Sequence, residues 1–200
     1  MKTVAKNPIP KTLLKNGVLR SSEAVLHGMS RMRLKRLVDQ GLLIREARGI
    51  YRIPDSPISE QDGLVHACSR VPGGVLCLLT ALQFHGMTTQ FPHEIWMAID
   101  VWARKPRIEH PPIRFVRFSG KARTVGLEEH RTKGGPIRVY SSAKTVMDCF
   151  KYRNKLGLDV ALEALKAYRA QKKGTMDDLW KCSRVCRVSN VIRPYLEALA

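Results

Sequence analysis

The spacing of hydrophobic and polar positions in the first 55 residues predicts short amphipathic helices. A first helix is expected over 9–17, between a proline near its start and a glycine at its end. A second is expected from a cap at Ser21 or Ser22 to Leu26, with Gly28 stopping it. A third helix follows after a short turn that contains this glycine. Two helices joined in this way have the outline of a helix-turn-helix unit.

The third predicted helix has two different faces. It runs from its cap at Ser30 to Gln40, and Leu34, Leu37 and Val38 share one side at 100° per residue. That side is expected to pack into a core. The opposite side and its flanks carry Arg31, Met32, Arg33, Lys35 and Arg36.

Residues 42–53 predict a pair of short strands that follow the third helix. The strands flank a tight turn at 47–49, and Ile50 and Ile53 alternate with polar residues. Helices followed by a two-stranded hairpin make a winged helix. Arg48 lies at the tip of the predicted wing, where a cation reaches a phosphate or the minor groove.

Charge decides between two interpretations of the third helix: an ordinary solvated helix or a DNA-binding one. The chain has 35 Lys and Arg against 17 Asp and Glu, a net charge of +18. Asp39 is the only acid between Glu23 and Glu46, so the helix lacks the mixed charge of an ordinary surface helix. With the turn and the wing, this favours DNA binding. The predicted base readers are Arg31, Lys35 and Arg36, or Ser30 and Met32 near the helix start.

The rest of the chain predicts strands first and helices afterwards. Two helices, over 59–71 and 75–87, come before the strands. A hairpin turn is expected at 133–135. Strands followed by helices favour an α+β domain over a doubly wound one. The strands are predicted, as an antiparallel set, over 93–101, 113–120, 125–132 and 136–141, and the later helices over 142–155, 159–173, 176–187 and 190–199.

We place a domain boundary in the segment 54–63, which contains two prolines. The predicted organisation is therefore a winged helix-turn-helix domain over 1–55 and a second, α+β domain over 56–200. The first carries 12 Lys and Arg against 4 Asp and Glu, a net +8. The second carries the remaining 23 against 13, a net +10, so charge is denser in the first.

The sequence contains no motif that predicts catalysis. Walker, GxGxxG and GxSxG motifs do not occur, and the six histidines are scattered. Asp148, Lys151 and Glu163 are the only set that resembles a metal-dependent nuclease, and their spacing does not suit one. Cys182 and Cys186 are spaced for a metal, but they continue an apolar stripe and are interpreted as core residues. We therefore expect no catalytic residue, no metal and no cofactor.

The predicted helix 142–155 admits two interpretations. Its apolar stripe is expected in the core, with the polar residues outside. The outer face is either solvated, with local pairs such as Lys144–Asp148, or a surface for a partner. The segment 104–138 also admits two interpretations. Its ten cations, against three acids, form either a second basic surface or a scattered solvated face. The candidate partner residues on the helix are Lys144, Asp148, Lys151, Tyr152 and Arg153.

The compartment is predicted from what the sequence lacks. No apolar run approaches the roughly 18 residues of a membrane span, so no membrane partner is expected. The start has no apolar signal core, and the five cysteines have no regular spacing. These features are typical of a cytoplasmic protein with reduced thiols.

The chain resembles the AbiEi family of antitoxins, the regulators of type IV toxin–antitoxin systems of abortive infection. The resemblance covers nearly the whole length. Its first part is generic to winged helices, whereas "AKTVMDCFKYR" is more specific. It rests on "LRSSEAVLHGMSRMRLKRLVDQGLLIREARGIYRIPD", "LTALQFHGMTTQFPHEIWMAI", "PPIRFVRFSG", "SSAKTVMDCFKYRNKLGLDVALEAL" and "NVIRPYLEALA".

The resemblance implies a DNA-binding autorepressor and antitoxin without catalytic residues. Members of the family bind inverted repeats in their own promoter and counteract a nucleotidyltransferase-type toxin, AbiEii, which the antitoxin need not contact directly. A dimer or two monomers of this chain could bind such repeats. An independent transcription regulator with a partner- or ligand-sensing second domain is the alternative, and a DNA-directed nuclease is a remote one. The implied DNA-binding residues are Ser30, Arg31, Met32, Arg33, Lys35 and Arg36 on the helix and Arg45, Arg48 and Arg52 on the wing.

Overall fold

The computed structural model describes residues 18–47, 49–54, 62–108, 110–132 and 135–198. The chain divides into two compact units, and the change from the first to the second falls between Asp62 and Gly63. Both units combine helices with a sheet, which confirms the predicted α+β class. The helix predicted over 9–17 and the turn at 133–134 lie outside the described residues.

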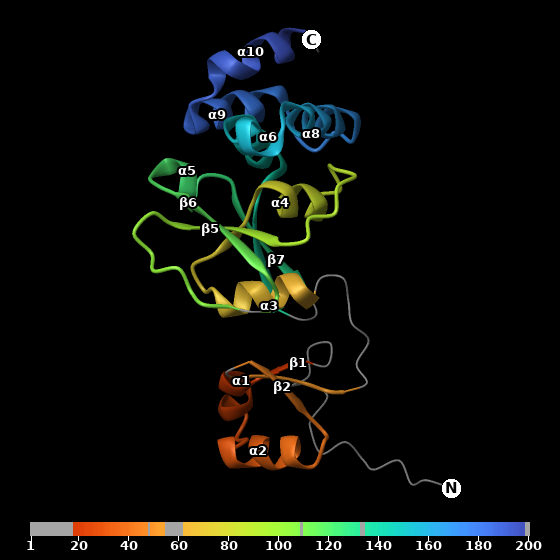
Figure 1. Ribbon diagram of the computed structural model, residues 1–200, viewed down its shortest axis with the longest axis vertical. Coiled ribbons are helices and arrows are strands. Elements are labelled where there is room, and N and C mark those ends of the chain that lie inside the picture. The colour runs from red at the N-terminus through yellow and green to blue at the C-terminus, as the bar shows by residue number, and fades with distance from the viewer. Residues whose placement is uncertain (1–17, 48, 55–61, 109, 133–134, 199–200) are drawn as a thin grey trace, which may run out of the picture. The chain divides into compact units, whose positions relative to one another are not determined.

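The first unit is a helix-turn-helix with a small antiparallel sheet (Figure 1). Its strands lie in the order β1-β3-β2, so the predicted hairpin of β2 and β3 gains a third strand from the residues that precede α1. The described elements are β1 (Val18–Arg20), α1 (Ser21–Leu26), α2 (Arg31–Asp39), β2 (Ile44–Ala47) and β3 (Ile50–Arg52).

The start of α1 differs from the prediction. Neither Ser21 nor Ser22 caps it, because the N-cap is Arg20, which makes no side-chain capping bond. The Ser21 backbone N–H instead donates to the Gly49 carbonyl oxygen at 2.8 Å. The helix therefore begins directly from β1, and its first donor is satisfied by the end of the wing turn rather than by a hydroxyl.

One hydrophobic core holds the first unit together. Both helices end as predicted at glycines with positive φ, Gly28 at 78° and Gly41 at 70°, a conformation that costs glycine little. The chain thus turns back sharply after each helix and returns apolar residues to the same core. The buried residues of that core are Leu19, Ala24, Met29, Leu34, Leu37 and Leu43.

The second unit is built on a five-stranded mixed sheet in the order β6-β5-β4-β8-β7. β4 pairs antiparallel with β5, but β4 with β8 and β5 with β6 are parallel, so the purely antiparallel prediction is wrong. The connection over 101–112 has the length of about a dozen residues that a parallel crossover requires. The strands are β4 (Val75–Leu76), β5 (Ile95–Asp100), β6 (Ile113–Phe118), β7 (Leu127–Thr132) and β8 (Gly135–Tyr140).

The central strand β4 was predicted as the start of a helix over 75–87. The structure divides this stretch into β4 and a shorter helix, α4 (Leu78–Phe84). Leu76 faces Met97 on one neighbouring strand and Val139 on the other. A two-residue strand has no periodicity of its own, so only its neighbours in the sheet reveal it.

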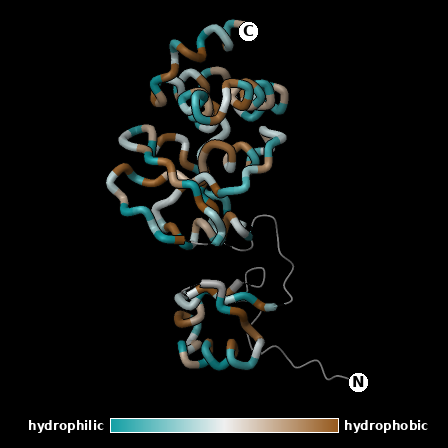
Figure 2. The backbone as a smooth tube through the Cα atoms, in the orientation of Figure 1, coloured by the Kyte–Doolittle hydropathy of each residue, from teal (hydrophilic) through white to brown (hydrophobic). Residues whose placement is uncertain are grey.

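Helices cover both faces of this sheet (Figures 1 and 2). α3 packs on one face, and α4, α6, α8, α9 and α10 contribute to a larger core on the other. The helix predicted over 142–155 is divided into α6 and α7, and α5 was not predicted. The elements are α3 (Asp62–Arg70), α5 (Lys121–Thr124), α6 (Ser142–Lys151), α7 (Arg153–Leu156), α8 (Leu158–Ala170), α9 (Met176–Cys186) and α10 (Ser189–Glu197).

Candidate nucleic-acid interface

The second helix of the helix-turn-helix, α2, is fixed at its start by its predicted cap. The Ser30 hydroxyl oxygen accepts a hydrogen bond from the Arg33 backbone N–H at 3.2 Å. This bond satisfies one of the donors that a helix leaves open at its first turn. The backbone of the residues predicted to contact DNA is thus held in helical form from the first turn.

The two faces of α2 divide as predicted. Leu34 and Leu37 are buried and Val38 is half-buried, while Met32 on the other side is 75 % exposed. Figure 2 shows the hydrophilic positions that alternate with hydrophobic ones along this helix. The first turn holds no acid. The exposed cations of the helix are Arg31, Arg33, Lys35 and Arg36.

The wing holds the three other predicted contacts in different environments. Arg45 is exposed on β2, opposite Tyr51 of β3. Arg52 is half-buried, and its Nη1 donates to the Pro54 carbonyl oxygen at 3.4 Å. Arg48 lies outside the described residues. The structure therefore presents the α2 residues and Arg45 to solvent, whereas the Arg52 guanidinium is partly engaged by the chain itself.

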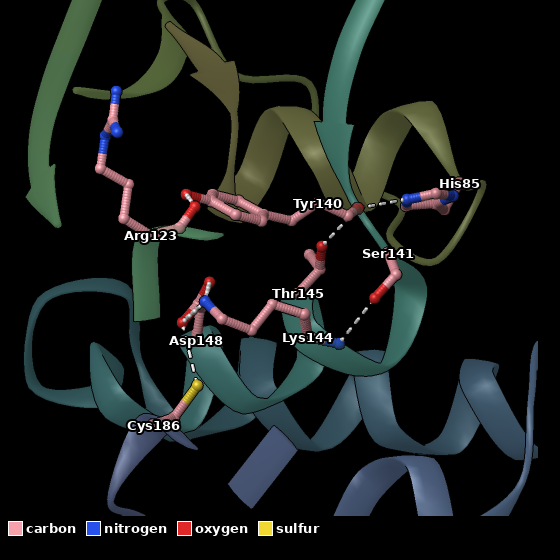
Figure 3. A network of polar contacts seen from close by, with 8 residues as sticks. All are labelled: His85, Arg123, Tyr140, Ser141, Lys144, Thr145, Asp148 and Cys186. Carbon is pink, nitrogen blue, oxygen red and sulfur yellow. Dashed lines mark hydrogen bonds and ion pairs between the residues drawn. The ribbon is translucent and has the colours of Figure 1, made fainter. Parts of the chain in front are cut away.

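The candidate partner surface on α6 requires a correction. Lys144 and Asp148 do not face outward, since they are 0 % and 1 % exposed. They form a buried ion pair, with the Lys144 Nζ donating to both Asp148 carboxylate oxygens at 2.7 and 2.6 Å (Figure 3). Sequence reasoning expected one buried stripe, but α4, α8, α9 and α10 surround α6, and Ser142 to Phe150 are all buried.

Aromatic rings and a thiol complete the surroundings of the pair. The Lys144 Nζ lies 4.4 Å from the Tyr140 ring centroid and 4.8 Å from that of Phe118. The Cys186 thiol donates to the Asp148 Oδ1 at 3.3 Å. Burial raises the pKa of Asp148, and the Lys144 ammonium partly opposes that rise. The predicted core position of Cys186 is confirmed, but its polar contact was not predicted.

The pair belongs to a larger polar network at the end of β8 (Figure 3). The Tyr140 carbonyl oxygen accepts from the Thr145 hydroxyl at 3.1 Å and from the His85 Nε2 at 2.7 Å. The Tyr140 hydroxyl donates to the Arg123 carbonyl oxygen at 2.8 Å. Burial lowers the pKa of His85. These bonds link residues that are far apart in the sequence, so helical spacing alone did not reveal them.

The other candidate partner residues remain nearer the surface. Lys151 is exposed, while Tyr152 and Arg153 are half-buried. The Arg153 Nη1 donates to the Phe150 carbonyl oxygen at 2.9 Å, which holds it at the end of α6. Of the five predicted partner residues, these three are the ones that a second molecule could contact.

A comparison with protein families decides what kind of helix-turn-helix the first unit is. Residues 9–54 match the family described as "Transcriptional regulator, AbiEi antitoxin". This confirms the predicted family for the segment that carries the cationic α2. The AbiEi match ends before the second unit begins.

The fold of the chain is similar to that of a solved structure that is distant in sequence. The crystal structure of the RV2827C protein from Mycobacterium tuberculosis has a TM-score of 0.56 and 16 % sequence identity. The similarity covers 90 % of this chain and 73 % of that chain. At this identity the likeness concerns the fold alone. No curated protein matches the sequence.

Two members of the candidate nuclease set are engaged by other residues of the second unit. Asp148 is buried against Lys144, so DNA cannot reach its carboxylate in the folded unit. Glu163 accepts hydrogen bonds from the Thr89 backbone N–H and hydroxyl, at 2.8 and 3.0 Å. Among the described residues no group of three His, Cys, Asp or Glu side chains is placed to hold a metal, and no helix is long and apolar enough to cross a membrane.

Proposed function

We propose that this protein is a DNA-binding autorepressor and the antitoxin of a type IV toxin–antitoxin system. It binds inverted repeats in its own promoter through the first unit. It counteracts a nucleotidyltransferase-type toxin through the second. The observation that carries the proposal is the exposed cationic face of α2 on a unit that matches AbiEi transcriptional regulators.

The geometry of α2 suits the major groove of DNA. A groove about 12 Å wide admits one α-helix, and the residues near the start of that helix contact base edges. On α2 these are Ser30, Arg31 and Met32, with Lys35 and Arg36 one turn further on. Arg33, Arg45, Arg48 and Arg52 are proposed to contact phosphates, which fix the position of the helix on the duplex.

Gel shifts test the DNA-binding part of the proposal. The protein is expected to shift DNA from upstream of its own gene more tightly than an unrelated duplex of the same length. Each phosphate contact should contribute about 0.9 to the slope of log K against log salt concentration. Several contacts therefore predict a slope of about −3 or steeper. Equal affinity for both duplexes would leave only charge-driven binding and would contradict promoter recognition.

Co-expression tests the antitoxin part. Growth is expected to stop when a neighbouring nucleotidyltransferase-type toxin is expressed and to recover when this protein is added. The accessible candidates for contact with the toxin are Lys151, Tyr152 and Arg153. Lys144 and Asp148 are not proposed as contacts, because both side chains are buried. A variant of α2 that no longer binds DNA should still restore growth. Failure of the unaltered protein to restore growth would reject the antitoxin role.

An independent transcription regulator is the second candidate function. It is favoured by the extent of the AbiEi match, which stops at residue 54 and leaves the second unit unassigned. This candidate predicts promoter binding as before, but no rescue from a toxin and no toxin gene beside the regulator gene. The identity of the neighbouring gene therefore separates the two.

A further inference from the structure

An exposed tryptophan lies in the turn that follows β5. The Trp102 side chain is 90 % exposed. It belongs to the connection from β5 to β6, the yellow-green loop at the side of the second unit (Figure 1). Tryptophan is usually well buried, because removing so large a ring from water is favourable. An open indole is therefore a ready contact for a second molecule.

Hydrogen bonds fix the backbone that carries this ring. The Ala103 backbone N–H donates to the Asp100 carbonyl oxygen at 3.1 Å and closes a four-residue turn. The Trp102 backbone N–H donates to the Asp100 Oδ1 at 2.9 Å. The Val101 backbone N–H donates to the Phe118 carbonyl oxygen at 3.1 Å, which ties the turn to the end of β6. A partner therefore does not have to order this backbone when it binds.

Arg117 of β6 places a cation directly beside the tryptophan. Its Nη1 donates to the carbonyl oxygens of Asp100 at 3.2 Å, Val101 at 2.6 Å and Ala103 at 3.0 Å. The last two residues flank Trp102 in the sequence. Carbonyl oxygens orient the guanidinium and leave its net charge in place, and the side chain is exposed. The turn thus carries a fixed positive charge next to the indole.

The connection itself is also cationic. Lys105 lies on the same face of the sheet as Arg117, because its Nζ is 5.8 Å from the centroid of the Phe115 ring, and Phe115 is two residues before Arg117 on β6. Residues 101–108 contain no acid and three exposed cations, Arg104, Lys105 and Arg107.

The acid of the turn is engaged by its own chain. The Asp100 carboxylate accepts the Trp102 backbone N–H through Oδ1, and its Oδ2 lies 3.5 Å from the Arg123 Nε. The next acid in the sequence, Glu109, lies outside the described residues. We call residues 100–108 the Trp102 loop. Its described part presents positive charge beside an open aromatic ring.

We propose that the Trp102 loop binds single-stranded nucleic acid, with an unpaired base stacked on the indole and the neighbouring phosphates on the loop cations and Arg117. Every nucleobase has a flat face that stacks on an aromatic ring. In a duplex the neighbouring base pairs cover these faces, so an unpaired base fits the ring best. Protein interfaces are depleted of lysine and bury tryptophan in pockets, which suits this loop less well. The proposal is independent of DNA binding by α2.

Fluorescence anisotropy with a labelled strand of about 12 nucleotides tests the site. The full chain with Arg31, Lys35 and Arg36 replaced by alanine removes the proposed contribution of α2. It is titrated with the single strand, as DNA and as RNA, and with the duplex of the same sequence. Adding Trp102→Ala is expected to weaken single-strand binding about tenfold or more and to leave duplex binding unchanged. Tighter binding of the RNA strand would add a contact to its 2′-hydroxyl groups.

Other substitutions separate stacking from apolar contact. Trp102→Phe keeps a flat ring and should retain most of the affinity. Trp102→Leu keeps an apolar side chain without a ring and should lose as much as Trp102→Ala. None of them should lower the melting temperature, because the side chain is exposed. Phe91 is the matched control, an aromatic residue 80 % exposed outside this loop, and Phe91→Ala should leave the affinity unchanged.

The loop cations are tested through the dependence on salt. Each phosphate contact of a single strand contributes about 0.7 to the slope of log K against log salt concentration, so replacing the three cations with alanine should flatten the slope by about 2. Removing three exposed cations elsewhere in the second unit should change it little. Full single-strand affinity in Trp102→Ala or Trp102→Leu would overturn the proposal, as would equal losses on strand and duplex. The three loop cations are Arg104, Lys105 and Arg107, and the three control cations are Lys166, Arg169 and Arg184.

Discussion

Replacing Arg31, Lys35 and Arg36 together with alanine is expected to abolish the gel shift on the upstream DNA. The three side chains extend from the exposed side of α2. A good contact between such a side chain and a base contributes about 1–3 kcal/mol. Three lost contacts therefore weaken binding by more than about a hundredfold. The loss is measured as the protein concentration that shifts half of the DNA.

The control for this triple variant removes the same amount of charge elsewhere. Lys166 and Arg169 on α8 and Arg184 on α9 are exposed cations of the second unit. Their replacement with alanine is expected to reduce affinity only modestly, through the net charge. If this control variant loses as much affinity as the α2 variant, DNA is held by overall charge. Unchanged affinity in the α2 variant would show that α2 does not read DNA.

Lys144→Met is expected to destabilise the second unit by about 3–5 kcal/mol, because it leaves the Asp148 carboxylate buried without its partner. Urea unfolding followed by circular dichroism measures the loss. The pKa of Asp148 is already raised above its ordinary 3.8, and loss of Lys144 raises it further. A group with a raised folded pKa loses stability as pH rises through that pKa. The variant should therefore regain stability as the pH falls toward 4.

Two further variants establish whether the pair itself is responsible. Lys151→Met removes an exposed lysine from the same helix and should change the free energy of unfolding by less than about 0.5 kcal/mol. Replacing both Lys144 with Met and Asp148 with Leu removes the buried charges together. This double variant is expected to recover most of the stability lost in Lys144→Met. A loss in Lys144→Met no larger than that in Lys151→Met would contradict the account.

The amphipathic pattern of α2 was enough to predict its bounds, its cap and its exposed cations. It lies at the surface of a small unit, so one face alone meets a core. The same reasoning failed on α6 because helices from both earlier and later in the chain, α4, α8, α9 and α10, surround it. The pattern correctly indicated a Lys144–Asp148 pair but placed it in solvent. The sequence of α6 itself contains no local signal for that burial.

Sequence-based prediction was limited in the same way for the sheet and for the cleft of the second unit that Trp96, Arg114 and Tyr152 line. Strands of six residues, such as β5 and β6, were predicted, whereas the two-residue β4 was not. The cleft joins Trp96 and Arg114 to Tyr152, which are brought together by strand pairing and by the end of α6. Tyr152 was considered only as a partner residue, because its neighbours in space are distant in the sequence.

The parallel pairing of Leu76 with Val139 determines the order in which the two units are completed during synthesis. All three strands of the first unit's sheet lie within residues 18–52, so they are all synthesised early. The central strand of the second unit, β4, lies between β5 and β8. Its first neighbour, β5, is synthesised soon after it, but its second neighbour, β8, is synthesised much later. Contacts between distant residues also form slowly. A nascent chain is therefore expected to carry a finished helix-turn-helix while its second unit is still open, so the unit that matches AbiEi regulators matures first.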